Sequence, residues 1–316
     1  LDVRNWEWDS GRTITLDGEW EFYPEVFLMA DDQVHTSPKH TAQYVKVPGD
    51  WNTYRHDSSS PYGYGSYRLR ILLEPEDHRV YGIYVPNVRS SSQLFVNGRL
   101  IRSSGQPAAQ AEDYLAKNVP YTASFTSEGN GVVEIVLQAA NFDDPRGGGL
   151  IRSLKFGLEE AVQHERHVSV SMQLLVACAL LFQASCFLVL YIIDRNKRWF
   201  YFSLVLFSMT LLITNSSEDK LLQFFFPIDF QWSFKILNLS IVLLLYSWIR
   251  FHIGEFPKAW RPKLLLWLRL VCVATGGLTF LLPVTYQIPL RNWTVGLVSP
   301  LFALSVVYAL KKALQG

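Results

Sequence analysis

The sequence predicts a chain of two parts, an all-β antiparallel sandwich followed by an all-α bundle of transmembrane helices. Two observations predict this division. Residues 1–166 hold 16 lysines and arginines against 23 acidic residues, in short alternating stretches separated by turns. Residues 167–316 hold 13 basic and only 5 acidic residues and consist mainly of long apolar runs. Such a layout argues against a soluble enzyme.

Residues 1–158 form the predicted head, in which alternation of apolar and other residues indicates about nine strands. These segments are residues 13–16, 19–23, 44–47, 67–71, 81–85, 93–96, 99–102, 121–125 and 133–137. Asn97-Gly98 between two of them is the strongest short signal for a hairpin. Short strands, Gly/Pro turns and no helical pattern predict a jelly-roll sandwich. The head has no cysteine, so we expect it to fold alone on its own apolar core.

The helical part begins with a predicted linker. Residues 159–167 are polar and lack glycine and proline, which favours a helical connection into the membrane. Five apolar runs in residues 168–316 then approach the length that a bilayer requires. They are residues 168–193, 199–214, 232–253, 264–284 and 293–310. Residues 221–230 are too short to span and predict a segment along the membrane interface.

Basic residues in the connections predict the orientation of the spans. Three connecting or terminal segments hold most of them: Arg195, Lys197 and Arg198; Lys258, Arg261 and Lys263; Lys311 and Lys312. The two opposite connections are richer in acid, with Glu218, Asp219 and Asp229. We therefore expect the basic segments and the C-terminus in the cytoplasm and the head outside. Gln173, Gln183 and Asn238 are candidates for hydrogen bonds between helices.

Candidate binding residues gather around a glycine-rich stretch of the head. Trp51, Tyr62 and Tyr64 offer aromatic faces beside polar groups, which suits sugars or other amphipathic ligands. Packing in the core is the alternative for each aromatic residue. Arg89 and Arg146 lie in expected turns and would clamp a carboxylate or phosphate, a plain surface position being the alternative.

The sequence predicts no catalytic residue, no metal site, no cofactor and no nucleic-acid partner. It shows no nucleophile elbow and no HExxH motif. Gly147-Gly148-Gly149 lacks the lysine and the following helix of a phosphate loop, so a turn is expected. Asp143 and Asp144 as calcium ligands are the alternative to a solvated acidic pair.

An ordered set of short motifs carries a family resemblance. These are Leu16–Tyr23 (LDGEWEFY), Val47–Trp51 (VPGDW), Gly63–Leu69 (GYGSYRL), Leu94–Gly98 (LFVNG) and Ala140–Phe142 (ANF). The head resembles the jelly-roll ectodomain of the bacterial seven-transmembrane receptors with diverse intracellular signalling modules (7TMR-DISM). More distantly it is similar to the sugar-binding domain of family 2 glycoside hydrolases. Five spans are visible where the family has seven, so we expect a truncation near Gly316.

The resemblance implies a signalling receptor in the bacterial inner membrane. Its periplasmic head would bind a small molecule, such as a carbohydrate, or a partner protein, which includes a second copy in a homodimer, and its helices would lie in the lipid bilayer. Two further helices and a cyclase, kinase or phosphatase module would follow. The alternative is a carbohydrate-binding module fused to a membrane enzyme or transporter of glycans.

Overall fold

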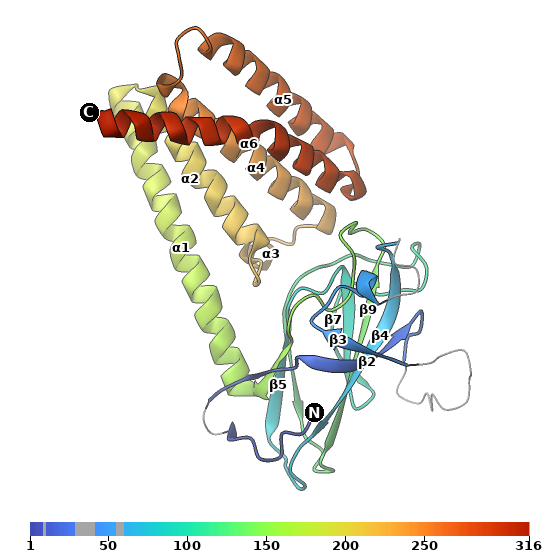
Figure 1. The fold of residues 1–316 in the computed structure, drawn as a ribbon. Coiled ribbons are helices and arrows are strands. Elements are labelled where there is room, and N and C mark those ends of the chain that lie inside the picture. Colours follow the sequence, from blue (N-terminus) through green and yellow to red (C-terminus); the bar gives the residue numbers. More distant parts are fainter. Residues whose placement is uncertain (9–10, 29–41, 55–59, 316) are drawn as a thin grey trace. The chain divides into compact units, whose positions relative to one another are not determined.

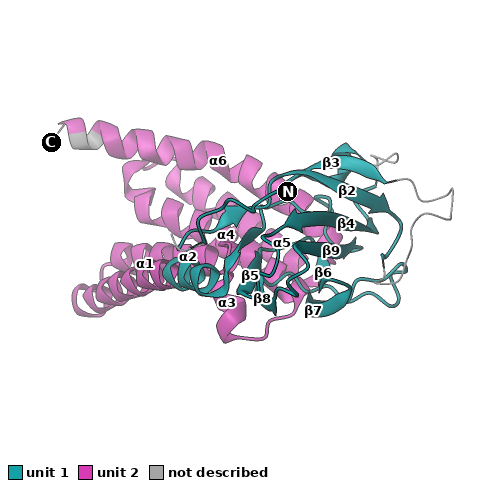
Figure 2. Ribbon diagram, turned by 90° about the horizontal axis from the view of Figure 1, so that it is seen from below, with its two compact units in different colours: residues 1–170 teal, residues 171–316 magenta. Residues whose placement is uncertain are grey.

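The computed structural model divides into two compact units, residues 1–170 and residues 171–316 (Figure 2). It describes residues 1–8, 11–28, 42–54 and 60–315. The first unit is a β sandwich and the second is helical (Figure 1). The predicted fold class is therefore confirmed.

Ten strands are found in the described part of the head, and every pairing between them is antiparallel. They are β1 (Ile14–Thr15), β2 (Gly18–Pro24), β3 (Gln43–Val47), β4 (Gly63–Leu72), β5 (Val80–Val85), β6 (Ser91–Val96), β7 (Arg99–Ser104), β8 (Tyr121–Thr126), β9 (Val132–Asn141) and β10 (Lys155–Leu158). One sheet has the order β3-β2-β4-β9-β6-β7 and the other β1-β10-β5-β8. From β4 onward the chain changes sheet at every connection except the β6–β7 hairpin, as in a jelly roll.

The core of the head lies between these two sheets. Strand β4 shows how the sequence builds it: Tyr67 and Ile71 point inward and are fully buried, whereas the arginines between them point outward. Trp20 is 1% exposed, and its indole donates to the carbonyl of Leu16. The predicted hairpin is also present, because Asn97 and Gly98 both adopt positive φ between β6 and β7.

Six α-helices occur in residues 159–315, and five of them are long and apolar enough to cross a membrane. They are α1 (Glu159–Asp194), α2 (Lys197–Ser216), α3 (Leu221–Phe225), α4 (Phe230–His252), α5 (Arg261–Leu281) and α6 (Val284–Gln315). Helix α3 is the short one, within the segment expected to be interfacial. A 3₁₀ turn, η4 (Ile253–Glu255), follows α4. The chain is a multi-pass membrane protein.

Helix α6 begins nine residues before the predicted fifth span, which started at residue 293. The sequence indicated a loop there because Gln287, Pro289 and Arg291 interrupt the apolar pattern. In the structure Gln287 is fully buried, and its side-chain amide donates to the carbonyls of Thr279 and Leu282 at 2.9 Å. A polar residue satisfied in this way can stay within a helix.

Side-chain hydrogen bonds join the helices of the second unit. Asn238 of α4 donates to the side chain of Gln287 at 2.7 Å, and Gln173 of α1 donates to Asp219 at 2.8 Å. Asn215 of α2 and Ser233 of α4 exchange two hydrogen bonds of 2.7 Å. Of the three residues expected to bond between helices, Asn238 makes such a contact with α6, whereas Gln173 bonds to Asp219 in the connection between α2 and α3.

Candidate functional site at the loop end of the head

Three connections of the head meet at one end of the sandwich. The first contains a 3₁₀ turn, η3 (Trp51–Thr53), the second joins β5 to β6, and the third joins β9 to β10. The amide of Gly49 donates to Leu150 at 2.8 Å and that of Trp51 to Gly148 at 3.1 Å, which ties the first connection to the third. Arg89 forms a β-bridge with Gly149, which ties the second to the third.

Asn141, the last residue of β9, shapes the third connection. Its fully buried amide nitrogen donates to the carbonyls of Asp144 at 2.8 Å and Gly147 at 2.9 Å. Its oxygen accepts from the backbone of Asp144 at 2.8 Å and from the hydroxyl of Ser90. One side chain thus holds the turn that carries Asp144 and Arg146 against the second connection.

Asp50, Arg89, Asp144 and Arg146 form a charged cluster where the connections meet. Arg146 binds the carboxylate of Asp144 through both Nε (2.8 Å to Oδ1) and Nη2 (2.6 Å to Oδ2). Arg89 places Nη1 3.5 Å from Oδ2 of Asp50 and Nε 3.9 Å from Oδ2 of Asp144. The Asp144 side chain is fully buried, whereas those of Arg89 and Arg146 are 18% and 34% exposed.

Within the charged cluster, the charged form of Arg89 is disfavoured by burial and by a neighbouring arginine. Burial lowers the pKa of the Arg89 guanidinium, and the nearby Arg146 adds to this, while Asp144 and Asp50 act in the opposite direction. The buried Nε of Arg89 has no hydrogen-bond partner among the described residues. The cluster therefore presents two partly exposed guanidinium groups and the partly exposed carboxylate of Asp50 to a polar ligand.

Trp51 packs in the core against the third connection, and neither face of its ring is exposed to solvent. Its ring is fully buried in the core, and Nε1 donates to the carbonyl of Pro61 at 3.2 Å. The backbone of Gly148 lies against the ring so closely that a Cβ there would overlap it. Trp51 thus takes the core position that was the alternative to a binding platform.

The two tyrosines of the expected site lie at the end of the first connection and the start of β4. Tyr64 is half-buried on the outer side of β4, with its ring 4.9 Å from that of Phe27. Tyr62 is half-buried, and its backbone amide contacts the hydroxyl of Ser60 at 3.3 Å. Of the five residues expected to bind ligand, the structure brings Arg89 and Arg146 together.

Asp50 was missed by the sequence analysis, and Asp144 was considered only as a calcium ligand. No local pattern links them to Arg89, because the three residues come from three separate connections. Asp144 faces guanidinium groups, and the described residues hold no group of three or more His, Cys, Asp or Glu side chains that could bind a metal ion.

A second feature of the head is the way its last strand enters α1. Strand β10 ends at Leu158 and α1 begins at Glu159. Glu159 accepts a hydrogen bond from Ser124 of β8 at 2.7 Å, and Arg166 donates to Thr122 of the same strand at 3.1 Å. Glu165 accepts from Thr13 and pairs with Lys155 of β10. The first two turns of α1 are thereby bound to the four-stranded sheet.

Strand β5 connects the two features. Its first part pairs with the end of β10, Tyr81 lying opposite Leu158 beside the start of α1. Its last residue, Val85, leads into the connection that carries Arg89. The charged cluster and the start of α1 therefore lie at opposite ends of one strand, about 20 Å apart along it.

Comparison with known proteins finds a match to one protein family within the helical part. Residues 169–316 match the family described as 7TM diverse intracellular signalling, which confirms the resemblance inferred from the sequence. No curated protein matches the chain.

Solved structures similar to the chain include several glycosidases. A GH2 β-galacturonidase from Eisenbergiella tayi bound to galacturonate is 18% identical, with a TM-score of 0.35 over 46% of this chain and 24% of the enzyme. The β-glucuronidase from Ruminococcus gnavus is 15% identical, with a TM-score of 0.33 over 46% of this chain and 29% of the enzyme. The β-glucuronidase from Faecalibacterium prausnitzii is also 15% identical, with a TM-score of 0.33 over 46% of this chain and 31% of the enzyme. The chain spans less than a third of these enzymes.

Proposed function

We propose that this chain is the sensing and membrane part of a transmembrane receptor. Its head binds a small ligand at the charged cluster, and α1 carries the resulting change into the helices. The observation that carries this proposal is the direct passage of β10 into α1, whose first two turns are bound to the sheet by Ser124, Thr13, Lys155 and Thr122. The family match of the helical part supports a signalling role.

The charged cluster favours a hydroxyl-rich ligand that carries a carboxylate, such as an acidic carbohydrate. Arg89 and Arg146 would receive the carboxylate, and Asp50 would accept hydrogen bonds from hydroxyl groups. Arg89 donates to the carbonyl of Arg146 at 3.3 Å, but it lies 3.5 Å from Asp50 and 3.9 Å from Asp144, so a closer anion would draw its guanidinium away from Asp50. Such a ligand prefers one of two arrangements of the cluster, which is the condition for a signal.

In this proposal the receptor lies in the bacterial inner membrane with its head in the periplasm. Its output is a cytoplasmic module of cyclase, kinase or phosphatase type. The basic connections after α1 and before α5 support this orientation. Single cysteines at positions 197 and 218, on a background without Cys178, Cys186 and Cys272, test it with an impermeant reagent. We expect labelling in intact cells at 218 alone, and labelling at 197 alone would reverse the topology.

The ligand site is tested on the full chain in lipid nanodiscs. A thermal-shift screen of uronic acids, neutral sugars and simple carboxylates should give a compound that raises the melting temperature. Arg89→Gln and Arg146→Gln should each weaken its binding about ten-fold or more, the loss expected for a charged hydrogen bond. Arg99→Gln, an exposed arginine of β7, is the matched control. Equal loss in all three variants would place the site elsewhere.

Hydrogen exchange separates binding from signalling. The compound should change the exchange of the amides of residues 160–167 at the start of α1, and not only that of the connections around Arg89. Binding without any change in α1 would make the head a binding module and remove the receptor function. A screen without any stabilising compound would favour a partner protein as the stimulus.

A further inference from the structure

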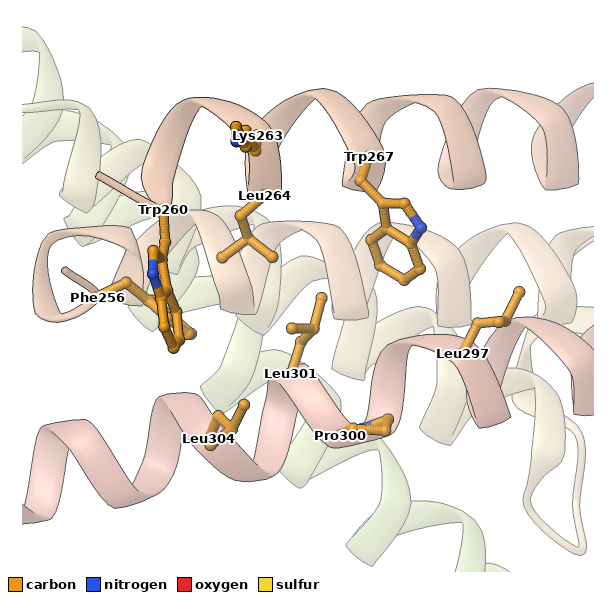
Figure 3. Close-up of a pocket in the computed structure, with 9 residues that line it drawn as sticks. All are labelled: Phe256, Trp260, Lys263, Leu264, Trp267, Leu297, Pro300, Leu301 and Leu304. Carbon is orange, nitrogen blue, oxygen red and sulfur yellow. The ribbon is translucent and has the colours of Figure 1, made fainter. Parts of the chain in front are cut away.

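A groove between α5 and α6 carries a further inference. It has a volume of about 390 Å³ and opens beside η4 (Figure 3). The lining residues are Phe256, Trp260, Lys263, Leu264, Trp267, Leu297, Pro300, Leu301 and Leu304. Eight of the nine are apolar or aromatic, and Lys263 is the single charged member of this set.

The walls of the groove are suited to a hydrocarbon chain. Leu264 and Trp267 extend from α5 toward α6, and Leu301 extends back toward α5 (Figure 3). Leu297, Leu301 and Leu304 follow helical spacing on one face of α6, which covers about 10 Å of its length. Trp267, Leu297 and Leu304 remain 36%, 49% and 41% exposed, so the groove has room at its surface for an apolar partner.

One end of the groove has the chemistry of a membrane interface. Lys263 lies in the first turn of α5, and Trp260 directly precedes that helix. Tryptophan rings settle at the level of lipid headgroups, and a lysine stem lies along apolar surface while its ammonium group reaches that level. Lys258 and Arg261 add positive charge to the same connection. This end therefore complements an anion.

Helix α6 lacks one backbone hydrogen bond at Pro300, a residue that lines the groove. Pro300 has no amide hydrogen, so the carbonyl of Gly296 loses its usual helical partner. The hydroxyl of Ser299 contacts that carbonyl at 3.4 Å, a long hydrogen bond. Proline is a common cause of helix bending, and a molecule packed against Pro300 and Leu301 would favour one bend over another.

We propose that this groove binds one anionic phospholipid. Its phosphate lies at Lys263, and one acyl chain lies against Leu297, Leu301 and Leu304. Basic pockets between spanning helices on the cytoplasmic side are known to suit such headgroups. The site is separate from the charged cluster of the head and requires no ligand there, so a bound lipid would act on α6 at Pro300 independently of that cluster.

The test uses the full chain purified in detergent and supplied with phosphatidylglycerol or phosphatidylcholine. Native mass spectrometry should detect one retained phosphatidylglycerol. Lys263→Gln should lower its retention about five-fold, the contribution of one lysine near an anionic headgroup. Leu301→Trp should lower it further by filling the groove. Lys197→Gln removes an exposed charge at the start of α2, outside the lining of the groove, and should leave retention unchanged.

Three results would overturn the proposal. Equal retention of phosphatidylcholine would show that the headgroup is not recognised. Retention that is unaffected by Lys263→Gln and Leu301→Trp would place bound lipid elsewhere. A dimer that dissociates on Leu301→Trp, with lipid retention unchanged, would show that a second copy of the chain occupies the groove. Should Leu301→Trp fail to fold, Leu304→Phe fills the same wall by a smaller change.

Discussion

Glu165, in the second turn of α1, forms an ion pair with Lys155 of β10, the strand that leads into that helix. The same carboxylate accepts a hydrogen bond from Thr13, which precedes β1. One side chain of the helix thereby contacts both the first and the last strand regions of the head. Movement of these strands would reach α1 through Glu165 before it reached the membrane.

Glu165→Gln should loosen the first turns of α1 without unfolding the head. The Lys155 and Glu165 side chains are 31% and 43% exposed, so their ion pair contributes less than about 1 kcal/mol. We expect amide exchange of residues 161–167 in the full chain to rise several-fold. The charge swap Lys155→Glu with Glu165→Lys should restore protection.

Glu160→Gln is the control for this variant because Glu160 is exposed on the neighbouring turn. It should leave the exchange of residues 161–167 unchanged. Normal protection in Glu165→Gln would mean that Ser124 and Thr122 alone hold the start of α1.

Trp51→Ala should destabilise the head expressed without the spanning helices. Removing a fully buried indole costs about 3–5 kcal/mol, which lowers the melting temperature of a domain of this size by roughly 10 °C or more. Tyr64→Ala should cost clearly less, because that ring is half-buried on the outer side of the sheet. A melt followed by circular dichroism compares the two, and a Trp51→Ala head as stable as the parent would contradict the core position.

Local features of the fold followed from the sequence. The hairpin at Asn97-Gly98 was predictable because those two residues accept the positive φ that its turn requires. The apolar runs identified the spans because few charges can be placed in lipid. Strand β10 was missed, since Lys155–Leu158 is only four residues long and contains Gly157, which weakens the strand pattern.

The charged cluster could not be predicted as a unit. Arg89 and Arg146 were each identified as candidate anion-binding residues, but their meeting depends on how Asn141 holds the β9–β10 connection. Asp50 joins them because the Gly147–Gly149 turn passes over Trp51. These are tertiary contacts between distant segments, and no periodicity or spacing in the sequence encodes them.

Asp144→Ala should strongly destabilise the head. The variant removes the bidentate partner of Arg146 and leaves Arg89 with Asp50 as its nearest anion. Breaking a fully buried pair costs about 3–5 kcal/mol, and because the Arg146 side chain is 34% exposed we expect roughly 2–3 kcal/mol here. Asp17→Ala, at an exposed aspartate before β2, should change stability by less than about 0.5 kcal/mol. Urea unfolding of the isolated head measures both, and similar midpoints would show that the cluster contributes no stability.

Asp77 gives the head a defined dependence on acid. Its carboxylate, 3% exposed, accepts hydrogen bonds from Arg79 at 2.8 and 3.0 Å and from the hydroxyl of Tyr81. Burial raises the pKa of Asp77, but the hydrogen bonds from Arg79 and Tyr81 outweigh it and bring the pKa to about 2. An unfolded aspartate has a pKa of about 3.9, so the folded head binds this proton more weakly.

The sign of the effect follows from that difference. The ionised form of Asp77 is favoured in the folded head, so its contribution is fully present above about pH 5 and is lost as pH falls toward 2. A difference of nearly two pKa units corresponds to a contribution on the order of 2 kcal/mol. Asp77→Asn keeps the shape of the side chain and removes its charge. The free energies of unfolding of parent and variant, measured in urea between pH 2.5 and 7, should therefore differ by a constant amount above pH 5 and converge below pH 4. A difference that stays constant down to pH 2.5 would show that Asp77 is not the titrating group.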